Sequence, residues 1–279
     1  MYKTIVVHVD GSPQQDSRMA AAARLAREHG AHLVGSAATG ISWTDYLLLT
    51  GSMAAPVPPA DFDGLRETAA LHLRAFTDRA AKLGVASVET RLIEDTADGA
   101  LLLQARYADL VVLSRDVDPE PGIPPRVRRL PEHVALRGPR PVLVVPPAYA
   151  DAPIAATVVA GWDGSTQALR ALAAALPLLA RADGVRLVLV NPDRLSDAHG
   201  EQPGADMALY LARHGVKVDV VLERTHATAG DALMALARTA GAGLIVAGAY
   251  GHSRYREWVL GGVTRELLER APAPLLLAH

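Results

Sequence analysis

An internal duplication constrains the fold of this 279-residue chain more than any other feature. Three apolar segments of the first half recur in the second half in the same order. The matched pairs are Thr4-Ile-Val-Val-His-Val-Asp10-Gly-Ser12 with Thr157-Val-Val-Ala-Gly-Trp-Asp163-Gly-Ser165, Leu110-Val-Val-Leu-Ser114 with Leu244-Ile-Val-Ala-Gly248, and Pro139-Arg-Pro-Val-Leu-Val-Val145 with Pro272-Ala-Pro-Leu-Leu-Leu-Ala278. The offsets are 153, 134 and 133 residues, so the first half carries an insertion of about 20 residues. A repeat of this length predicts two domains of one architecture.

Within each half, short runs of Val, Leu and Ile alternate with Ala-rich amphipathic stretches. This alternation is typical of buried parallel strands joined by right-handed helical crossovers. In the first half we predict strands near 3–9, 31–37, 86–92, 109–114 and 141–145, and helices near 13–29, 63–83, 97–107 and 126–137. In the second half we predict strands near 156–162, 185–191, 216–222, 243–248 and 274–278, and helices near 165–182, 202–214, 229–240 and 254–270.

Local signals support these boundaries. Asp-Gly-Ser precedes the first helix of each half, as a turn and N-cap would. Glycines stand where four helices are expected to end, at Gly30, Gly84, Gly184 and Gly215. The predicted domains are 1–147 and 154–279, joined by the short Pro-rich segment 146–153. The extra residues of the first half lie in 39–62, which is either a flap packed on its own domain or a lid or partner-binding loop.

Composition narrows the function classes. The net charge is −2, so no overall basic field favours nucleic acid or an anionic membrane. The chain has no cysteine, which excludes disulfides, thiolate nucleophiles and Cys-based metal sites. No apolar run approaches the roughly 18–20 residues of a membrane span, and the N-terminus enters a strand pattern directly. We therefore expect a cytoplasmic protein.

A glycine-rich segment follows the fourth strand of the second half. It reads Gly248, two residues, Gly251, nine residues, then Gly261-Gly262-Val263-Thr264. Glycines at a strand end and at a helix start allow the backbone to approach phosphates closely. The spacing is neither that of the Rossmann fingerprint nor that of a Walker A loop.

This spacing, the two strand-Asp-Gly-Ser-helix units and the closing Ala-Pro-Leu-Leu-Leu strand together resemble a tandem universal stress protein over essentially the whole chain. The resemblance implies an α/β fold with two doubly wound five-stranded parallel-sheet domains of strand order 3-2-1-4-5. It also implies that the last strands, 142–145 and 275–278, pair as an intramolecular pseudo-dimer. A homodimer of two chains stays open.

The resemblance further implies an ATP site at the strand ends beside the switch point. Asp163 would recognise the adenine end, although Asp-Gly-Ser serves a turn equally well. Val190 and Asn191 would meet the adenine through their backbone. Gly248, Gly251, Gly261, Gly262 and Val263 would hold the phosphates, and Gly262 replaces the hydroxyl residue usual in the family. Thr264 would supply a hydroxyl or only pack its helix, and His252 and Arg254 would neutralise phosphate or be solvated.

The corresponding segment of the first half departs from this pattern. Ser114 and Val117 stand in place of the first two glycines, and Arg128 and Arg129 in place of the second pair. Because Val does not readily adopt positive φ and prolines remove backbone donors, the phosphate cradle is lost there. We interpret the first half as a structural or regulatory domain, although its arginines could still bind an anion.

Catalytic signatures of serine hydrolases, zinc proteases and ATP pyrophosphatases are missing from the sequence. We therefore predict an ATP-binding stress-response or regulatory protein that at most hydrolyses ATP slowly, with Mg²⁺ as the usual companion of ATP. The alternative is a nucleotide-free interaction scaffold that uses 39–62 and the sheet edges.

Overall fold

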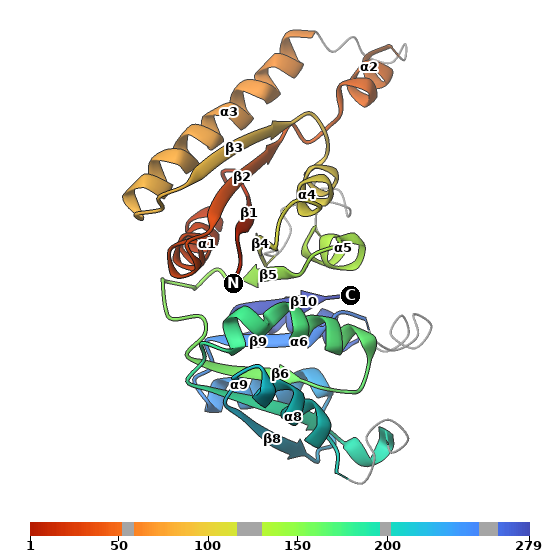
Figure 1. Ribbon diagram of the computed structural model, residues 1–279. Helices are drawn as coiled ribbons and strands as arrows, with labels where there is room; N and C mark the ends of the chain where they lie inside the picture. The colour runs from red at the N-terminus through yellow and green to blue at the C-terminus, as the bar shows by residue number, and fades with distance from the viewer. Residues whose placement is uncertain (52–58, 116–129, 196–201, 251–261) are drawn as a thin grey trace.

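The computed structural model describes residues 1–51, 59–115, 130–195, 202–250 and 262–279 and places the duplicated apolar runs in one sheet (Figure 1). The first domain contributes β1 (Thr4–His8), β2 (His32–Ala38), β3 (Val88–Ile93), β4 (Leu110–Ser114) and β5 (Val142–Val145). The second contributes β6 (Thr157–Gly161), β7 (Gly184–Val190), β8 (Val218–Glu223), β9 (Leu244–Gly248) and β10 (Leu275–Ala278). In the strands between the edge strands β3 and β8, consecutive residues can be apolar because helices cover both sheet faces.

The strand order is β3-β2-β1-β4-β5-β10-β9-β6-β7-β8. Each domain thus has the predicted order 3-2-1-4-5, and every strand pair inside a domain is parallel. The domains join where β10 pairs antiparallel with β5, with Leu276 opposite Leu143. The predicted fold is confirmed, including the pairing of the two last strands within one chain.

The helices form two layers. The first domain has α1 (Gln15–His29), α2 (Trp43–Gly51), α3 (Pro59–Lys82), α4 (Ala97–Ala105) and α5 (Leu130–Arg137). The second has α6 (Thr166–Leu179), the 3₁₀ turn η2 (Pro192–Leu195), α8 (Ala205–Arg213), α9 (Ala229–Thr239) and α11 (Val263–Arg270). Helices α1, α3, α6 and α8 pack on one face, and α4, α5, α9 and α11 on the other.

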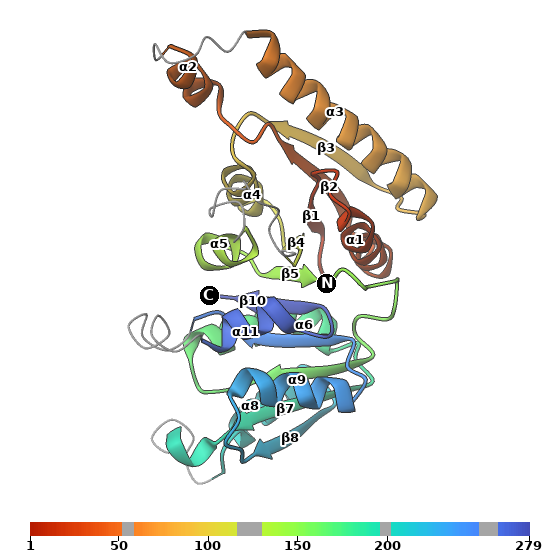
Figure 2. The ribbon, with the colours of Figure 1, turned by 180° about the vertical axis from the view of Figure 1, so that it is seen from behind.

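Both hydrophobic cores cross the boundary between the domains. Leu143 of β5 and Leu276 of β10 belong to one core, and Val142 and Leu275 belong to the other. Helix α5 contacts α11 across the same boundary. From behind, Figure 2 shows these two helices on opposite sides of the β5–β10 junction. The two domains therefore share their packing, and a change near the junction can reach both.

Some predicted element boundaries were wrong. Gly184 begins β7 and does not end a helix, because α6 stops at Leu179 with Ala180 as its C-cap. Gly30, Gly84 and Gly215 do have the left-handed backbone expected after a helix. Within segment 39–62 the described residues include α2 and the start of α3 at Pro59, and the aromatic rings of Trp43 and Tyr46 pack on Phe62. The predicted helical residues 126–129 and 254–261 lie outside the described residues.

Candidate functional site

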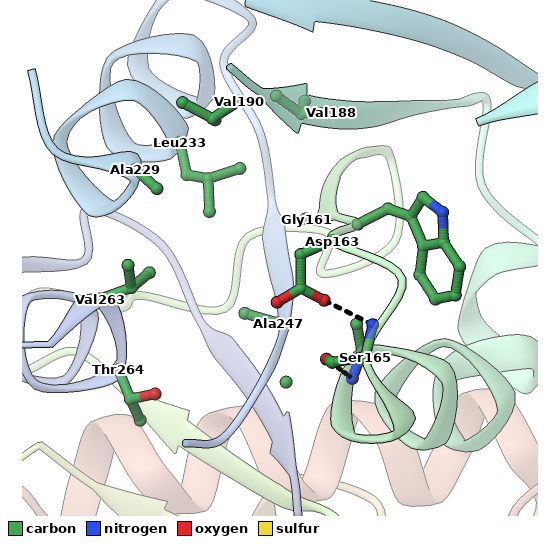
Figure 3. Close-up of a pocket in the computed structure, with 13 residues that line it drawn as sticks. Gly161, Asp163, Ser165, Val188, Val190, Ala229, Leu233, Ala247, Val263 and Thr264 are labelled. Carbon is green, nitrogen blue, oxygen red and sulfur yellow. Dashed lines mark hydrogen bonds between the residues drawn. The ribbon is translucent and has the colours of Figure 1, made fainter. Parts of the chain in front are cut away.

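A pocket opens in the second domain at the carboxyl ends of its parallel strands (Figure 3). Its cavity measures about 170 Å³. The strand order creates this opening because β6 lies between β7 and β9, so its end is the topological switch point of the domain. The described residues that line it are Gly161, Trp162, Asp163, Ser165, Ala168, Val188, Val190, Ala229, Leu233, Ala247, Gly248, Val263 and Thr264.

Asp163 lies just beyond the end of β6, and its carboxylate points into the cavity (Figure 3). One carboxylate oxygen accepts a hydrogen bond from the Ser165 backbone N–H at 3.0 Å, which closes the Asp-Gly-Ser turn. The Ser165 hydroxyl in turn accepts from the Ala168 N–H at 3.1 Å and caps α6. Asp163 therefore has the turn role weighed from the sequence and also lines the pocket.

Gly248 allows β9 to approach the start of α6 closely. A Cβ at this position would lie 2.5 Å from the Ala168 backbone nitrogen and 2.7 Å from the Gln167 carbonyl carbon. Both distances are shorter than real Cβ contacts, so a side chain would push the strand and the helix apart. The glycine thus sets the depth of this wall of the pocket.

Three helix N-termini converge on the pocket. Ser165 and Ala168 come from α6, Ala229 from α9, and Val263 and Thr264 from α11. Each helix start carries partial positive charge and backbone N–H groups without partners inside the helix. Ser165 caps α6 and Thr228 caps α9, whereas Gly262 at the N-cap of α11 provides no side-chain cap. The first-turn amides of α11 are consequently the ones most suited to an anionic ligand.

Thr264 is buried and connects the pocket wall to Tyr250, two residues beyond the end of β9. Its hydroxyl oxygen accepts a hydrogen bond from the Tyr250 backbone N–H at 3.0 Å. A hydroxyl has one donor and two acceptor sites, so the O–H of Thr264 can still donate to a ligand. Of the remaining predicted phosphate-loop residues, Gly251, His252, Arg254 and Gly261 lie outside the described residues.

At the end of β7 the two predicted residues have different surroundings. Val190 lines the apolar side of the pocket together with Val188 and Leu233 (Figure 3). Asn191 is not among the described lining residues. Its amide group donates to the Thr225 carbonyl at 2.9 Å and accepts from the Thr225 N–H at 3.0 Å, so its side chain holds the turn after β8.

The matching position of the first domain holds a buried arginine. Arg18 lies 153 residues before Ala171, which is a buried alanine of α6. The guanidinium donates to the Ser114 hydroxyl at the end of β4 at 3.0 Å, to the Gln15 amide oxygen at 2.7 Å, and to the Asp10 carboxylate. Arg18 therefore bridges the ends of β1 and β4, where the second domain has its pocket.

This cluster also perturbs titration in the first domain. Burial by itself raises the pKa of the Asp10 carboxyl, but His8, Arg18 and hydrogen bonds from Ser12 outweigh burial and lower that pKa to about 2. Burial lowers the pKa of His8 to about 4, against the opposing attraction of Asp10. At neutral pH the cluster thus contains an ionised carboxylate, a guanidinium and a neutral imidazole. Ser12 takes part in it and does not cap α1, whose N-cap is Gln14.

Some site residues were missed from the sequence. Trp162, Ala229 and Leu233 line the pocket but lie outside the glycine motif. The cap sequence Thr228-Ala-Gly-Asp231 after a predicted strand was a usable signal for the start of α9. Arg18 could have been noticed by aligning the two halves, because it is a charged residue at the position where the second half has Ala171.

The residues that the structure describes contain no group of three or more His, Cys, Asp or Glu side chains arranged to hold a metal ion. In the same residues, no helix is long and apolar enough to cross a membrane.

The fold and the pocket together define a tandem pair of doubly wound α/β domains that resembles nucleotide-binding folds at its switch point. The chain belongs to the universal stress protein family, whose profile matches residues 1–146 and again residues 156–279. A comparison with curated proteins gives no significant match.

Solved structures repeat this architecture. A universal stress protein from Archaeoglobus fulgidus DSM 4304 is 15% identical over 99% of this chain and 95% of its own, with a TM-score of 0.70. A functionally unknown protein from Pseudomonas aeruginosa PAO1 is 13% identical over 99% and 92%, with a TM-score of 0.62. A universal stress protein in complex with cAMP is 28% identical over 52% of this chain and 97% of its own, with a TM-score of 0.40. The first two show that the fold extends over the whole chain.

Proposed function

We propose that this protein binds ATP in the pocket of its second domain and acts as a nucleotide-responsive regulator in the cytoplasmic stress response. The observation that carries the proposal is the convergence of three helix N-termini on a pocket at the ends of β6 and β9. Positive helix ends and exposed backbone N–H groups favour a polyphosphate. Membership of the universal stress protein family supports the same ligand class.

The chemistry of the lining suggests how ATP is oriented. Val188, Val190 and Leu233 form an apolar wall suited to the adenine ring. Asp163, whose carboxylate also lines the pocket, accepts a hydrogen bond from the base or the ribose. The phosphates then lie toward Gly248 and the uncapped start of α11, where Gly251, His252, Arg254 and Gly261 complete the loop.

The test is ATP binding, measured calorimetrically with Mg²⁺ present. A hydrogen bond to a charged group contributes about 1.5–3 kcal/mol, so Asp163→Ala should weaken ATP about 10- to 100-fold. Asp183→Ala is the matched control, because Asp183 is an exposed carboxylate of the same domain outside the pocket. Gly251→Val should block the phosphate approach. Wild-type affinity in both Asp163→Ala and Gly251→Val would refute this site.

One observation favours a second function, an interaction scaffold without nucleotide. Helix α2, in the insertion of the first domain, exposes apolar side chains to solvent, with Leu47 47% and Leu48 68% accessible. Release of small molecules from the purified, denatured protein separates the two functions, since a co-purifying adenine nucleotide supports ATP binding. Slow ATP hydrolysis is a further possibility within the first proposal, and steady-state phosphate release with Mg²⁺ measures it.

A further inference from the structure

One side chain of the second domain reaches from the edge of the pocket into the first domain. Tyr250 follows β9 and directly precedes Gly251 of the predicted phosphate loop. Its phenolic O–H donates to the Glu132 carboxylate at 2.7 Å, and Glu132 lies in the first turn of α5. Since α5 belongs to the first domain, this hydrogen bond links the two domains beside the pocket.

The backbone of Tyr250 is also fixed by hydrogen bonds. Its N–H donates to the hydroxyl of Thr264, a pocket-lining residue in the first turn of α11. The preceding residue, Ala249, donates its N–H to the Ala278 carbonyl at 2.8 Å and accepts from the His279 ring at 2.7 Å. Thr264, Tyr250 and Glu132 therefore form a continuous connection from the pocket wall to α5.

Tyr250 also has an unfavourable backbone conformation. Its φ is +57°, in the left-handed region, which costs a non-glycine residue roughly 1 kcal/mol or more. Such a conformation persists only where neighbouring contacts hold it. It also sets the direction in which the chain continues toward Gly251. Removing one anchor allows Tyr250 to relax, and a ligand that needs the original direction must then restore it at the expense of affinity.

We infer that Glu132 of the first domain is a positioning residue for the ligand site of the second domain, acting through its hydrogen bond to Tyr250, and that occupancy of that site is thereby communicated to α5. This inference rests on the proposed ATP site. It gives the first domain, whose own switch point is occupied by Arg18, a role in regulating the other domain. Coupling of this kind is reciprocal, so a partner that moves α5 changes ATP affinity by the same factor as ATP changes partner binding.

The direction in which Glu132→Ala changes ATP affinity distinguishes a positioning role of Glu132 from simple charge repulsion. Removing the negative charge of Glu132 near a site for a polyanion would by itself strengthen ATP binding. Loss of the anchor weakens it. Glu132→Gln retains a carbonyl oxygen that can accept from the phenol, so it should restore most of the affinity that Glu132→Ala loses.

The experiment is a double-mutant cycle on the full chain, with ATP affinity measured calorimetrically. We expect Tyr250→Phe and Glu132→Ala each to weaken ATP about 5-fold, and the double variant to be no weaker than either single variant. Tyr107→Phe is the control, because Tyr107 is a 72% exposed tyrosine of the first domain. Additive losses in the double variant, or wild-type affinity in both single variants, would overturn the inference.

Hydrogen exchange gives a second readout that a merely structural role would not move. ATP should slow amide exchange in α5 (Leu130–Arg137) in the wild type and leave it unchanged in Tyr250→Phe. Equal slowing in both proteins would overturn communication through this bond. A wild type that does not bind ATP refutes the proposed function instead. In that case hydrogen exchange of the Tyr250 amide in the ligand-free protein tests whether Glu132 anchors Tyr250. If it does, this amide should exchange about 5-fold faster in Glu132→Ala than in the wild type.

Discussion

The close approach of β9 to α6 predicts a specific cost for a side chain at Gly248. In Gly248→Ala, the new Cβ would lie 2.5 Å from the Ala168 backbone nitrogen. Ordinary van der Waals contact begins near 3.4 Å, so strand and helix must separate by roughly 0.9 Å. Neither moves freely, because β9 is paired on both sides and Ser165 caps the first turn of α6.

The magnitude follows from two opposing effects. Overpacking of a well-packed site costs about 1–3 kcal/mol. Replacing glycine by alanine also reduces the freedom of the unfolded chain, which stabilises by about 0.4–1 kcal/mol where the backbone is compatible. Gly248 is not one of the described glycines with positive φ, so this gain applies. The net expectation is a loss of about 1–2 kcal/mol in the free energy of unfolding.

Two glycines of the same domain calibrate the measurement. A Cβ at Gly184 meets nothing within 4 Å, so Gly184→Ala should be neutral or slightly stabilising. A Cβ at Gly161 would lie 3.2 Å from the flexible Leu233 side chain and 3.8 Å from the Val246 carbonyl oxygen, so Gly161→Ala should fall between the other two variants.

Urea denaturation followed by far-UV circular dichroism measures all three, and midpoints are comparable where the m-values agree. A Gly248→Ala variant as stable as Gly184→Ala would refute the reasoning. Because Ala168 lines the pocket, the same variant should also weaken ATP binding.

Two further predictions concern buried polar groups of the first domain. Arg18→Met should lower the free energy of unfolding by about 2–4 kcal/mol in urea denaturation, because Asp10 and Ser114 lose their buried partner, whereas the exposed Arg74→Met should change it by less than about 0.5 kcal/mol. Burial, helped by the nearby Arg181, lowers the pKa of His29 to about 4. At His29 the unfolded state therefore binds more protons between about pH 6.5 and 4, so the contribution of His29 to stability is constant above this range and should fall by up to about 3 kcal/mol as the pH drops through it. A His29→Gln variant with an unchanged pH profile would contradict this assignment.

Most of the fold could be predicted because the strands between the two edge strands are buried on both faces. Runs such as Leu110–Leu113 and Leu244–Ala247 have few polar residues, and their strand limits came within one or two residues. Helix limits in the insertion were harder, since α2 depends on aromatic packing against Phe62, which follows after a stretch rich in proline. Pro59 at the first position of α3 was a usable start signal.

The candidate site was predictable where residues follow strand ends directly. Asp163, Gly248 and Thr264 lie about 100 residues apart at most, yet they line one pocket because β6 and β9 are neighbours in this topology. Asn191 was predicted to meet the ligand through its backbone, and that prediction stays open. Its side chain bonds to the backbone of Thr225, a local hydrogen bond that position along the strand does not reveal. The Tyr250–Glu132 contact depends on how the two domains pair, which no local pattern encodes.

The duplication lets the two domains keep one fold while their switch points differ. At a switch point, backbone groups at the strand ends and helix starts lack partners within their own elements. The two domains differ in which side chains lie beside these groups. In the first domain the Arg18 side chain lies between the ends of β1 and β4 and donates hydrogen bonds to Ser114 and Asp10. In the second domain the corresponding positions hold Ala171 and Gly248, which have no polar side chain, and Gly248 lines a pocket there. Because both domains share two continuous cores and the Tyr250–Glu132 hydrogen bond, we expect the first domain to support the pocket of the second domain if that pocket binds ATP as proposed.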